Sequence, residues 1–271
     1  MKLKFTIFAP LLLLATQAYA QTDDAAAEMA RKAQDPLGDV QAIMTDNTIA
    51  FGASEEDDVI YNLQLQPVYA IKNDTKFNMI ARAVIPIIGI EEGSYWPPLG
   101  QAPQDGGSHW GLSDIMLQYF FSPKSEGTWK YGFGPQVSID TSKSERQKGP
   151  GNGAGIAAVV FGGVGNWALG SILMQHWGDD DFNVATVQLI AMYNFESLPG
   201  AYMGYNNSIS INWEANSDNK YTVPLGATAG RTILLKSGNG LDFSGGIYGM
   251  VAQPEDSPDW QLKLGVSYFF N

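Results

Sequence analysis

Apolar and polar residues alternate with a period of two along most of the chain. The clearest case is the stretch "WQLKLGVSYFFN" at residues 260–271. Its apolar positions are Trp260, Leu262, Leu264, Val266, Tyr268 and Phe270, and they alternate with Gln261, Lys263, Gly265 and Ser267. Successive side chains of a β-strand point to opposite sides, so this alternation predicts a strand with one apolar and one polar face.

The same period recurs in eleven segments that are separated by turn residues. A twelfth strand is predicted at "NTIAFGA", because single-chain bacterial barrels have an even number of strands. The predicted strands span residues 47–53, 59–69, 77–85, 112–121, 129–139, 154–163, 167–177, 184–195, 201–213, 221–232, 241–252 and 260–271. Trp, Tyr or Phe begins or ends the apolar faces, as in the aromatic girdles of membrane barrels.

The pattern therefore predicts an all-β fold, a single up-and-down antiparallel transmembrane β-barrel of about twelve strands. The predicted barrel covers residues 47–271 and follows a short N-terminal helical segment. The alternative is a soluble β-sandwich, which gives the same alternation. The polar faces favour the barrel, because they are rich in Gln, Gly and Ser, as expected for a wet lumen.

The stretch from Gly151 to Gly178 has no charged side chain, and hydropathy alone suggests a membrane helix there. Its glycines and the dipeptide Gly165–Asn166 are instead turn chemistry between two apolar runs. We therefore predict a hairpin of strands 154–163 and 167–177.

Loop lengths predict an orientation. If the last strand ends in the periplasm, the short turns fall on the periplasmic side. The long connections, residues 89–110 and 140–153, then fall outside, as is usual for outer-membrane barrels.

Residues 1–20 have the basic start, apolar centre and "AYA" site of a secretory signal peptide, with cleavage predicted after Ala20. Residues 21–46 are predicted to form a periplasmic tail or a plug inside the lumen. "DDAAAEMARKA" favours a short helix, and a second segment starts after Pro36. Val40, Ile43 and Met44 follow a helical spacing, so we expect part of 35–46 to fold inward and narrow the periplasmic mouth.

The formal net charge is −12, and removal of Lys2 and Lys4 with the signal peptide makes it −14. Such an acidic chain is not expected to bind nucleic acid, which requires a basic face. The absence of cysteine and the presence of only two histidines leave few ligands for zinc or copper. We therefore predict no cofactor, no resident metal and no catalytic residue.

Several segments carry a resemblance to a known family, among them "DPLGDVQAIMTDNTIAFG", "GLSDIMLQYFFSP", "GNWALGSILMQHWG" and "TVPLGATAGRT". The sequence resembles Gram-negative outer-membrane barrels catalogued as transporters, some under the label "neuromedin U". It is also similar to barrels associated with phenol meta-cleavage pathways. The resemblance implies an outer-membrane protein that passes a small solute, hydrophobic or aromatic solutes included, and it names no particular substrate.

The aromatic end of the last strand resembles the signal that the barrel assembly machinery reads, with Tyr268 and Phe270 as the signal residues. The expected partners are therefore this machinery, outer-membrane lipids with lipopolysaccharide, and a small-molecule solute.

Five charged residues fall on predicted polar faces and are candidates for lining the lumen: Arg82, Asp114, Lys130, Asp242 and Lys263. They either line a constriction or simply cross-brace a wet interior. Their mixed signs argue against strong charge selectivity, because selective pores use rings of one sign.

Acidic clusters at residues 55–58, 91–92, 179–181 and 255–259 are predicted in the outer loops. They are interpreted as solvated loop charge. The alternative is that they hold Mg²⁺ or Ca²⁺ that bridges to lipopolysaccharide phosphates.

His109 and His176 are the candidates for a histidine-dependent hydrolase, but neither has a serine two residues away. Polar positions near the outer loops are the favoured interpretation of both histidines. We therefore predict a passive channel or transporter that is not an enzyme. The alternatives are a lipid-acting barrel hydrolase and a closed barrel with a structural or surface-binding role.

Overall fold

The computed structural model describes residues 23–53, 58–90, 95–96, 100–101, 109–124, 127–144 and 147–270. The predicted signal peptide, residues 1–20, lies outside the described residues. The helix is α1 (Asp23–Gln34). The strands are β1 (Gln41–Ala53), β2 (Asp58–Ile71), β3 (Phe77–Ile90), β4 (Tyr95–Trp96), β5 (Gly100–Gln101), β6 (His109–Leu112), β7 (Ile115–Pro123), β8 (Lys130–Ile139), β9 (Gly153–Val164), β10 (Trp167–Trp177), β11 (Asn183–Asn194), β12 (Ala201–Asn212), β13 (Tyr221–Leu234), β14 (Gly240–Ala252) and β15 (Trp260–Phe270).

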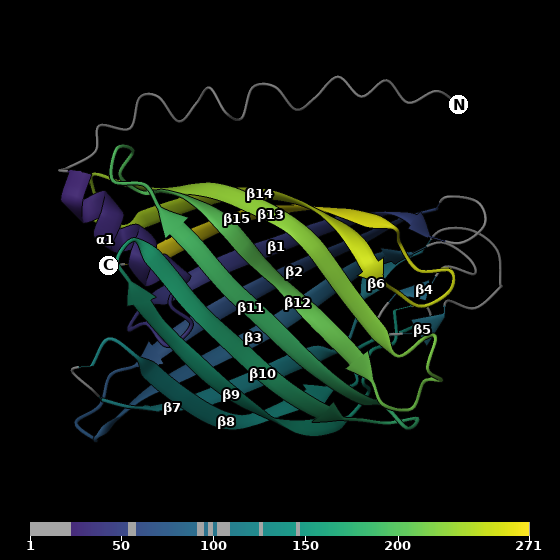
Figure 1. The fold of residues 1–271 in the computed structure, drawn as a ribbon. Helices are drawn as coiled ribbons and strands as arrows, with labels where there is room; N and C mark the ends of the chain where they lie inside the picture. The colour runs from purple at the N-terminus through teal and green to yellow at the C-terminus, as the bar shows by residue number, and fades with distance from the viewer. Residues whose placement is uncertain are drawn as a thin grey trace.

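The strands close into an antiparallel barrel (Figure 1). Each wall strand pairs with its neighbour in sequence, and β1 closes the ring by pairing with β2 on one side and β15 on the other. Both β6 and β7 pair with β3 and together form one interrupted wall strand, so the wall has twelve strands with β6 as an extra piece. The short strands β4 and β5 form a separate hairpin. The predicted fold class is confirmed.

The wall has the two faces that the sequence pattern predicts. Along β8, Tyr131, Phe133 and Val137 are exposed, whereas Gln136 and Ser138 are buried inside. Exposed large apolar side chains of this kind occur on strands all around the barrel. A continuous apolar outer surface on a closed barrel suits lipid and excludes the two-sheet sandwich.

Both described ends of the chain lie at one rim of the barrel, named here the terminal rim, where α1 and the end of β15 are found (Figure 1). Connections at this rim are short, such as residues 165–166 and 235–239. The opposite rim, named the loop rim, carries the longer connections and the β4–β5 hairpin. Which rim faces the periplasm stays a prediction. Among the described residues, no helix is both long enough and apolar enough to cross a membrane.

The predicted hairpin of the uncharged stretch is confirmed, since β9 and β10 pair along their whole length. The turn between them is Gly165–Asn166, and Gly165 has φ +58°. A side chain is disfavoured in that left-handed conformation, so glycine belongs there.

The first strand begins six residues earlier than predicted, at Gln41 rather than at position 47. Residues 41–46 pair with β15 and β2 and are part of the wall, so the expected helical stripe of Val40, Ile43 and Met44 is wrong. The sequence pattern missed this part of the strand, because Thr45 and Asn47 are polar although they lie on the same outer face as the apolar Ile43. Both bond to backbone carbonyls of β15, at 2.9 and 3.0 Å.

Candidate functional site

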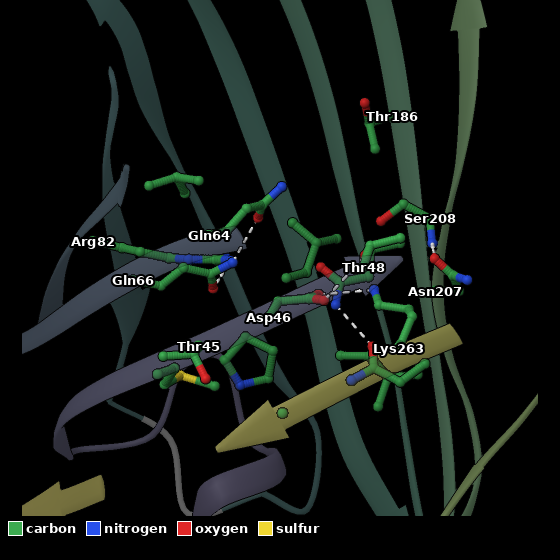
Figure 2. Close-up of a pocket in the computed structure, with 18 of the residues that line it drawn as sticks. Thr45, Asp46, Thr48, Gln64, Gln66, Arg82, Thr186, Asn207, Ser208 and Lys263 are labelled. Carbon is green, nitrogen blue, oxygen red and sulfur yellow. Dashed lines mark hydrogen bonds and ion pairs between the residues drawn. The ribbon is translucent and has the colours of Figure 1, made fainter. Parts of the chain in front are cut away.

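The barrel encloses a lumen cavity of about 470 Å³. Its lining comes from most of the wall strands and from the chain segment that links α1 to β1. One group of lining side chains is polar, as Figure 2 shows for Gln64, Gln66, Asp46, Lys263 and Asn207. The alternation of the wall strands thus places a mixed polar and apolar surface around an interior space.

The link between α1 and β1 is a tight turn, named here the Asp35–Gly38 turn. The Gly38 N–H donates to the Asp35 carbonyl at 3.0 Å, and the Leu37 N–H donates to the Asp35 carboxylate at 2.9 Å. Asp, Pro and Gly at the first, second and fourth positions are the residues that such a turn prefers. The sequence "DPLG" therefore ends α1 and turns the chain toward β1.

Leu37 is fully buried inside the terminal end of the barrel. It packs in an apolar cluster formed by inward-facing side chains, namely Ile80, Phe120, Ala157, Val159 and Ile172. Gly132 makes room for it, because a Cβ at that position would lie 2.6 Å from a Leu37 methyl carbon. The Asp35–Gly38 turn is thus seated within the barrel rather than below it.

Polar contacts hold the same segment. Lys130 of β8 forms an ion pair with Asp35, whose side chain is only 7% exposed. Gln34 exchanges two hydrogen bonds with Asn194 of β11, at 3.0 and 3.1 Å. The predicted lumen residue Lys130 therefore faces inward, and its partner is a residue that the sequence did not single out.

The helix α1 packs against β13 and β14 at the terminal rim. A hydrogen bond from Lys32, together with its charge, lowers the pKa of the Glu28 carboxyl one turn earlier. Because both side chains are exposed, water screens this pair and it contributes little to stability.

Arg82 lies on β3 and lines the lumen cavity (Figure 2). Its Nη2 atom donates to the Gln66 side-chain oxygen at 2.6 Å, and the Gln66 amide donates to Gln64 at 2.8 Å. On the other side of β3, Gln118 is the register partner of Arg82 and donates to Gln136 at 3.1 Å. An arginine thus stands in a belt of neutral amides that crosses β2, β3, β7 and β8.

Lys263 also lines the cavity, and it forms an ion pair of 2.8 Å with Asp46 of β1. Asp46 was not predicted as a lumen residue, because residues up to 46 were assigned to the N-terminal segment. Asp46 stands two residues before Thr48, so a prediction that began the first strand earlier would have placed both side chains on the inner face.

Asp242 is buried and lines the cavity. It accepts hydrogen bonds from Tyr202 at 2.8 Å and from Thr232 at 2.6 Å. Its hydrogen bonds therefore connect β12, β13 and β14 near the terminal rim.

Asp114 is placed differently from the other predicted lumen residues. It lies between β6 and β7, is buried, and does not line the lumen cavity. Its carboxylate accepts backbone N–H bonds from Thr141, Ser142, Gly149 and Gly151, at 2.7–3.1 Å. Asp114 thus organises the connection between β8 and β9 at the loop rim.

His176 and Ser138 meet in the interior wall, with His176 Nε2 2.8 Å from Ser138 Oγ. His176 Nδ1 lies 3.2 Å from the side-chain nitrogen of Gln136. That amide also donates to the Gln175 carbonyl and accepts from Gln118, which determines its orientation. Nδ1 therefore accepts a hydrogen bond, and Nε2 carries the proton that points to Ser138. In this tautomer the histidine does not remove the serine proton, as a serine hydrolase requires.

Sequence reasoning missed this pair, because the two residues are on different strands, 38 positions apart. The other histidine, His109, begins β6 and pairs with Ile90 of β3. Ser108, beside it in sequence, lies outside the described residues.

Of the acidic clusters, residues 55–57 and 91–92 lie outside the described residues. Asp179 accepts the Asn152 N–H at 2.8 Å, and Asp180 forms an ion pair with Lys148. These carboxylates tie together two connections of the loop rim. In the part of the chain that the structure describes, no group of three or more His, Asp or Glu side chains is arranged to hold a metal ion.

The two residues predicted as an assembly signal lie on the outer face of β15. The rings of Tyr268 and Phe270 meet edge to face with centroids 4.9 Å apart, and Phe270 pairs with Gln41 of β1. The two rings therefore lie at the closing seam of the barrel, and their role as an assembly signal stays a prediction.

A closed twelve-stranded barrel with an apolar outer wall and a partly polar interior is the fold of an outer-membrane β-barrel. No protein-family model matches the sequence, and no curated protein matches it. Among solved structures, the chain is similar to the COG4313 outer membrane channel from Pseudomonas putida F1. The TM-score is 0.59 and the identity 12%, over 85% of this chain and 94% of that chain.

The chain is also similar, more weakly, to two phospholipases. Outer membrane phospholipase A from Escherichia coli has a TM-score of 0.41 and 12% identity, over 86% of this chain and 96% of that one. The outer membrane phospholipase dimer of Salmonella typhi with bound calcium has a TM-score of 0.41 and 11% identity, over 93% and 99%. A likeness of this strength carries no argument about activity.

Proposed function

We propose that this protein is a passive outer-membrane channel for a small solute. The observation that carries the proposal is the lumen cavity of about 470 Å³ inside a closed barrel whose outer wall is apolar. Such a wall suits lipid, and the interior offers polar and apolar side chains to a solute. The similarity of the fold to that of a Pseudomonas outer membrane channel supports the same function.

The Asp35–Gly38 turn narrows the terminal end of the channel in this proposal. Leu37 is its apolar anchor, and the Asp35–Lys130 pair is its polar one. The turn is linked to α1, which packs on β13 and β14 at the rim. Movement of this unit opens the path, and the wall itself stays intact because the turn contributes no wall strand. Proposed partners are lipopolysaccharide and the barrel assembly machinery.

Two other functions remain in competition. A closed barrel with a structural role is favoured by the same buried Leu37, because a permanently seated turn blocks passage. A lipid-acting hydrolase is suggested only by the Ser138–His176 contact, and the tautomer of His176 opposes it. The channel explains both the cavity and the segment that enters it.

Conductance of the purified mature chain in planar bilayers tests the proposal. We expect small, discrete conductance steps that grow when residues 21–38 are deleted. The deletion stops at position 38 because β1 begins at Gln41. Heat-modifiable gel mobility serves as the control for an intact barrel. A deletion variant that is heat-modifiable but does not conduct would show that the barrel is closed.

A further inference from the structure

Among the residues that the structure describes, Arg82 is the cavity-lining cation that forms no ion pair with a carboxylate, and Asp46 acts on its charge only from beyond ion-pair distance. The cavity-lining carboxylates each have another partner. Asp35 pairs with Lys130, Asp46 pairs with Lys263, and Asp242 accepts from two hydroxyl groups. Arg82 itself bonds to the neutral amide of Gln66, and its Nε is buried without an acceptor.

The residues that pair with Arg82 across the sheet are neutral as well. Its register partner on β7, Gln118, carries an amide, and its register partner on β2 is Val68. A guanidinium has five N–H donors in a planar fork, and a neutral amide uses one of them here. A carboxylate suits such a fork, because it accepts two parallel hydrogen bonds and compensates the charge.

An apolar wall adjoins this cation. Gln118 contacts the sulfur atoms of Met116 and Met174, at 3.6 and 3.2 Å. Five of the nine methionines line the cavity, namely Met44, Met116, Met174, Met192 and Met250. Flexible, polarizable methionine side chains adapt to apolar bodies of different shapes. The cavity therefore combines one cation that lacks an ion-pair partner with an adaptable apolar surface.

We propose that Arg82 binds the carboxylate of an amphipathic monoanion, whose apolar body lies against the methionine side chains. This inference rests on the proposed function, because it treats the lumen as the path of the solute. It goes further by naming the substrate class. Lys263 plays a different part, since Asp46 already neutralises it.

The test compares benzoate with benzamide, a neutral molecule of nearly the same shape. Saturation-transfer NMR on purified, heat-modifiable protein measures the affinity of each. Hydrogen bonds to charged groups predict a preference for benzoate of about tenfold or more. Hexanoate and hexanamide form a second pair, which separates aromatic from aliphatic apolar bodies. Equal affinity for the acid and the amide in both pairs overturns the proposal.

Two variants locate the preference. Arg82→Met removes the charge and keeps an apolar stem, so benzoate binding should fall about tenfold while benzamide binding stays. Arg82→Lys keeps the charge without the fork and should retain part of the preference. Arg231→Met, at an exposed arginine of β13, is the matched control and should change nothing. The proposal is overturned if both Arg82 variants keep the full preference for benzoate. If Arg82→Met does not fold, Arg82→Lys is compared with the wild type, and a full preference in Arg82→Lys overturns the proposal.

Conductance is recorded separately on the same preparations. Conductance without a preference for the carboxylate refutes the Arg82 site and leaves the channel standing. A preference without conductance refutes the channel and leaves Arg82 as the binding residue of a closed barrel.

Discussion

Lys130 of β8 and Asp35 of the N-terminal turn form an ion pair across 95 positions of sequence. The Asp35 side chain is only 7% exposed, and the Lys130 side chain is 37% exposed. This pair joins a segment that is not part of the wall to a strand that is. It gives the turn a specific partner inside the barrel.

We expect Lys130→Met to release the turn and to raise the open fraction of the channel. The change leaves the Asp35 carboxylate buried without its cation, which costs about 1–3 kcal/mol. Because about 1.4 kcal/mol corresponds to a tenfold change in an equilibrium, the released population should rise roughly tenfold or more. Single-channel recording measures it, and Lys124→Met at an exposed residue of the same rim is the control. An unchanged open fraction would contradict the role of this ion pair in holding the turn inside the barrel.

Leu37→Ala should have a similar effect for an apolar reason. Truncation of a fully buried leucine costs roughly 2–5 kcal/mol. Here the loss destabilises the position of the turn inside the barrel. Adding Gly132→Ala to this variant should restore part of the closure, because the new methyl group occupies the space that the leucine vacated. Conductance and heat-modifiable mobility are the measurements. Leu225→Ala on the exposed face of β13 is the control, and equal conductance of all four proteins would refute the role of Leu37.

Phe270→Asp should reduce the amount of assembled barrel more strongly than Asn271→Asp. A charge near the membrane interface costs only about 0–1 kcal/mol, so a large loss would report assembly rather than stability. Phe270 stands at the seam between β15 and β1, where the barrel closes. Quantitative immunoblots of heat-modifiable protein in outer-membrane fractions measure the effect. The assembly role fails if both variants reach the same level.

Ser138→Ala should leave lipid hydrolysis at the background rate of the wild type. The reason is that His176 donates its Nε2 proton to the serine and takes none from it. Loss of one buried hydrogen bond should lower stability by about 1 kcal/mol. Release of labelled fatty acid from phospholipid vesicles is the assay. Activity in the wild type that disappears in the variant would revive the hydrolase hypothesis.

The alternation of apolar and polar residues predicts most of this fold from local information. A period of two requires only that neighbouring side chains point to opposite faces, so strand number, face and turns such as Gly165–Asn166 can be read along the chain. The reading failed at β1, where Thr45 and Asn47 stand on the outer face. Their polar groups are satisfied by carbonyls of β15, a strand more than 200 positions away.

The same limit applies to the candidate site. The sequence by itself placed Arg82, Lys130, Asp242 and Lys263 on inward faces, because facing is a local property of a strand. Only the closed barrel decided that Lys130 meets Asp35, that Lys263 meets Asp46, and that Arg82 forms no ion pair among the described residues. Those pairings depend on register and closure, which bring distant strands together and which no local pattern encodes.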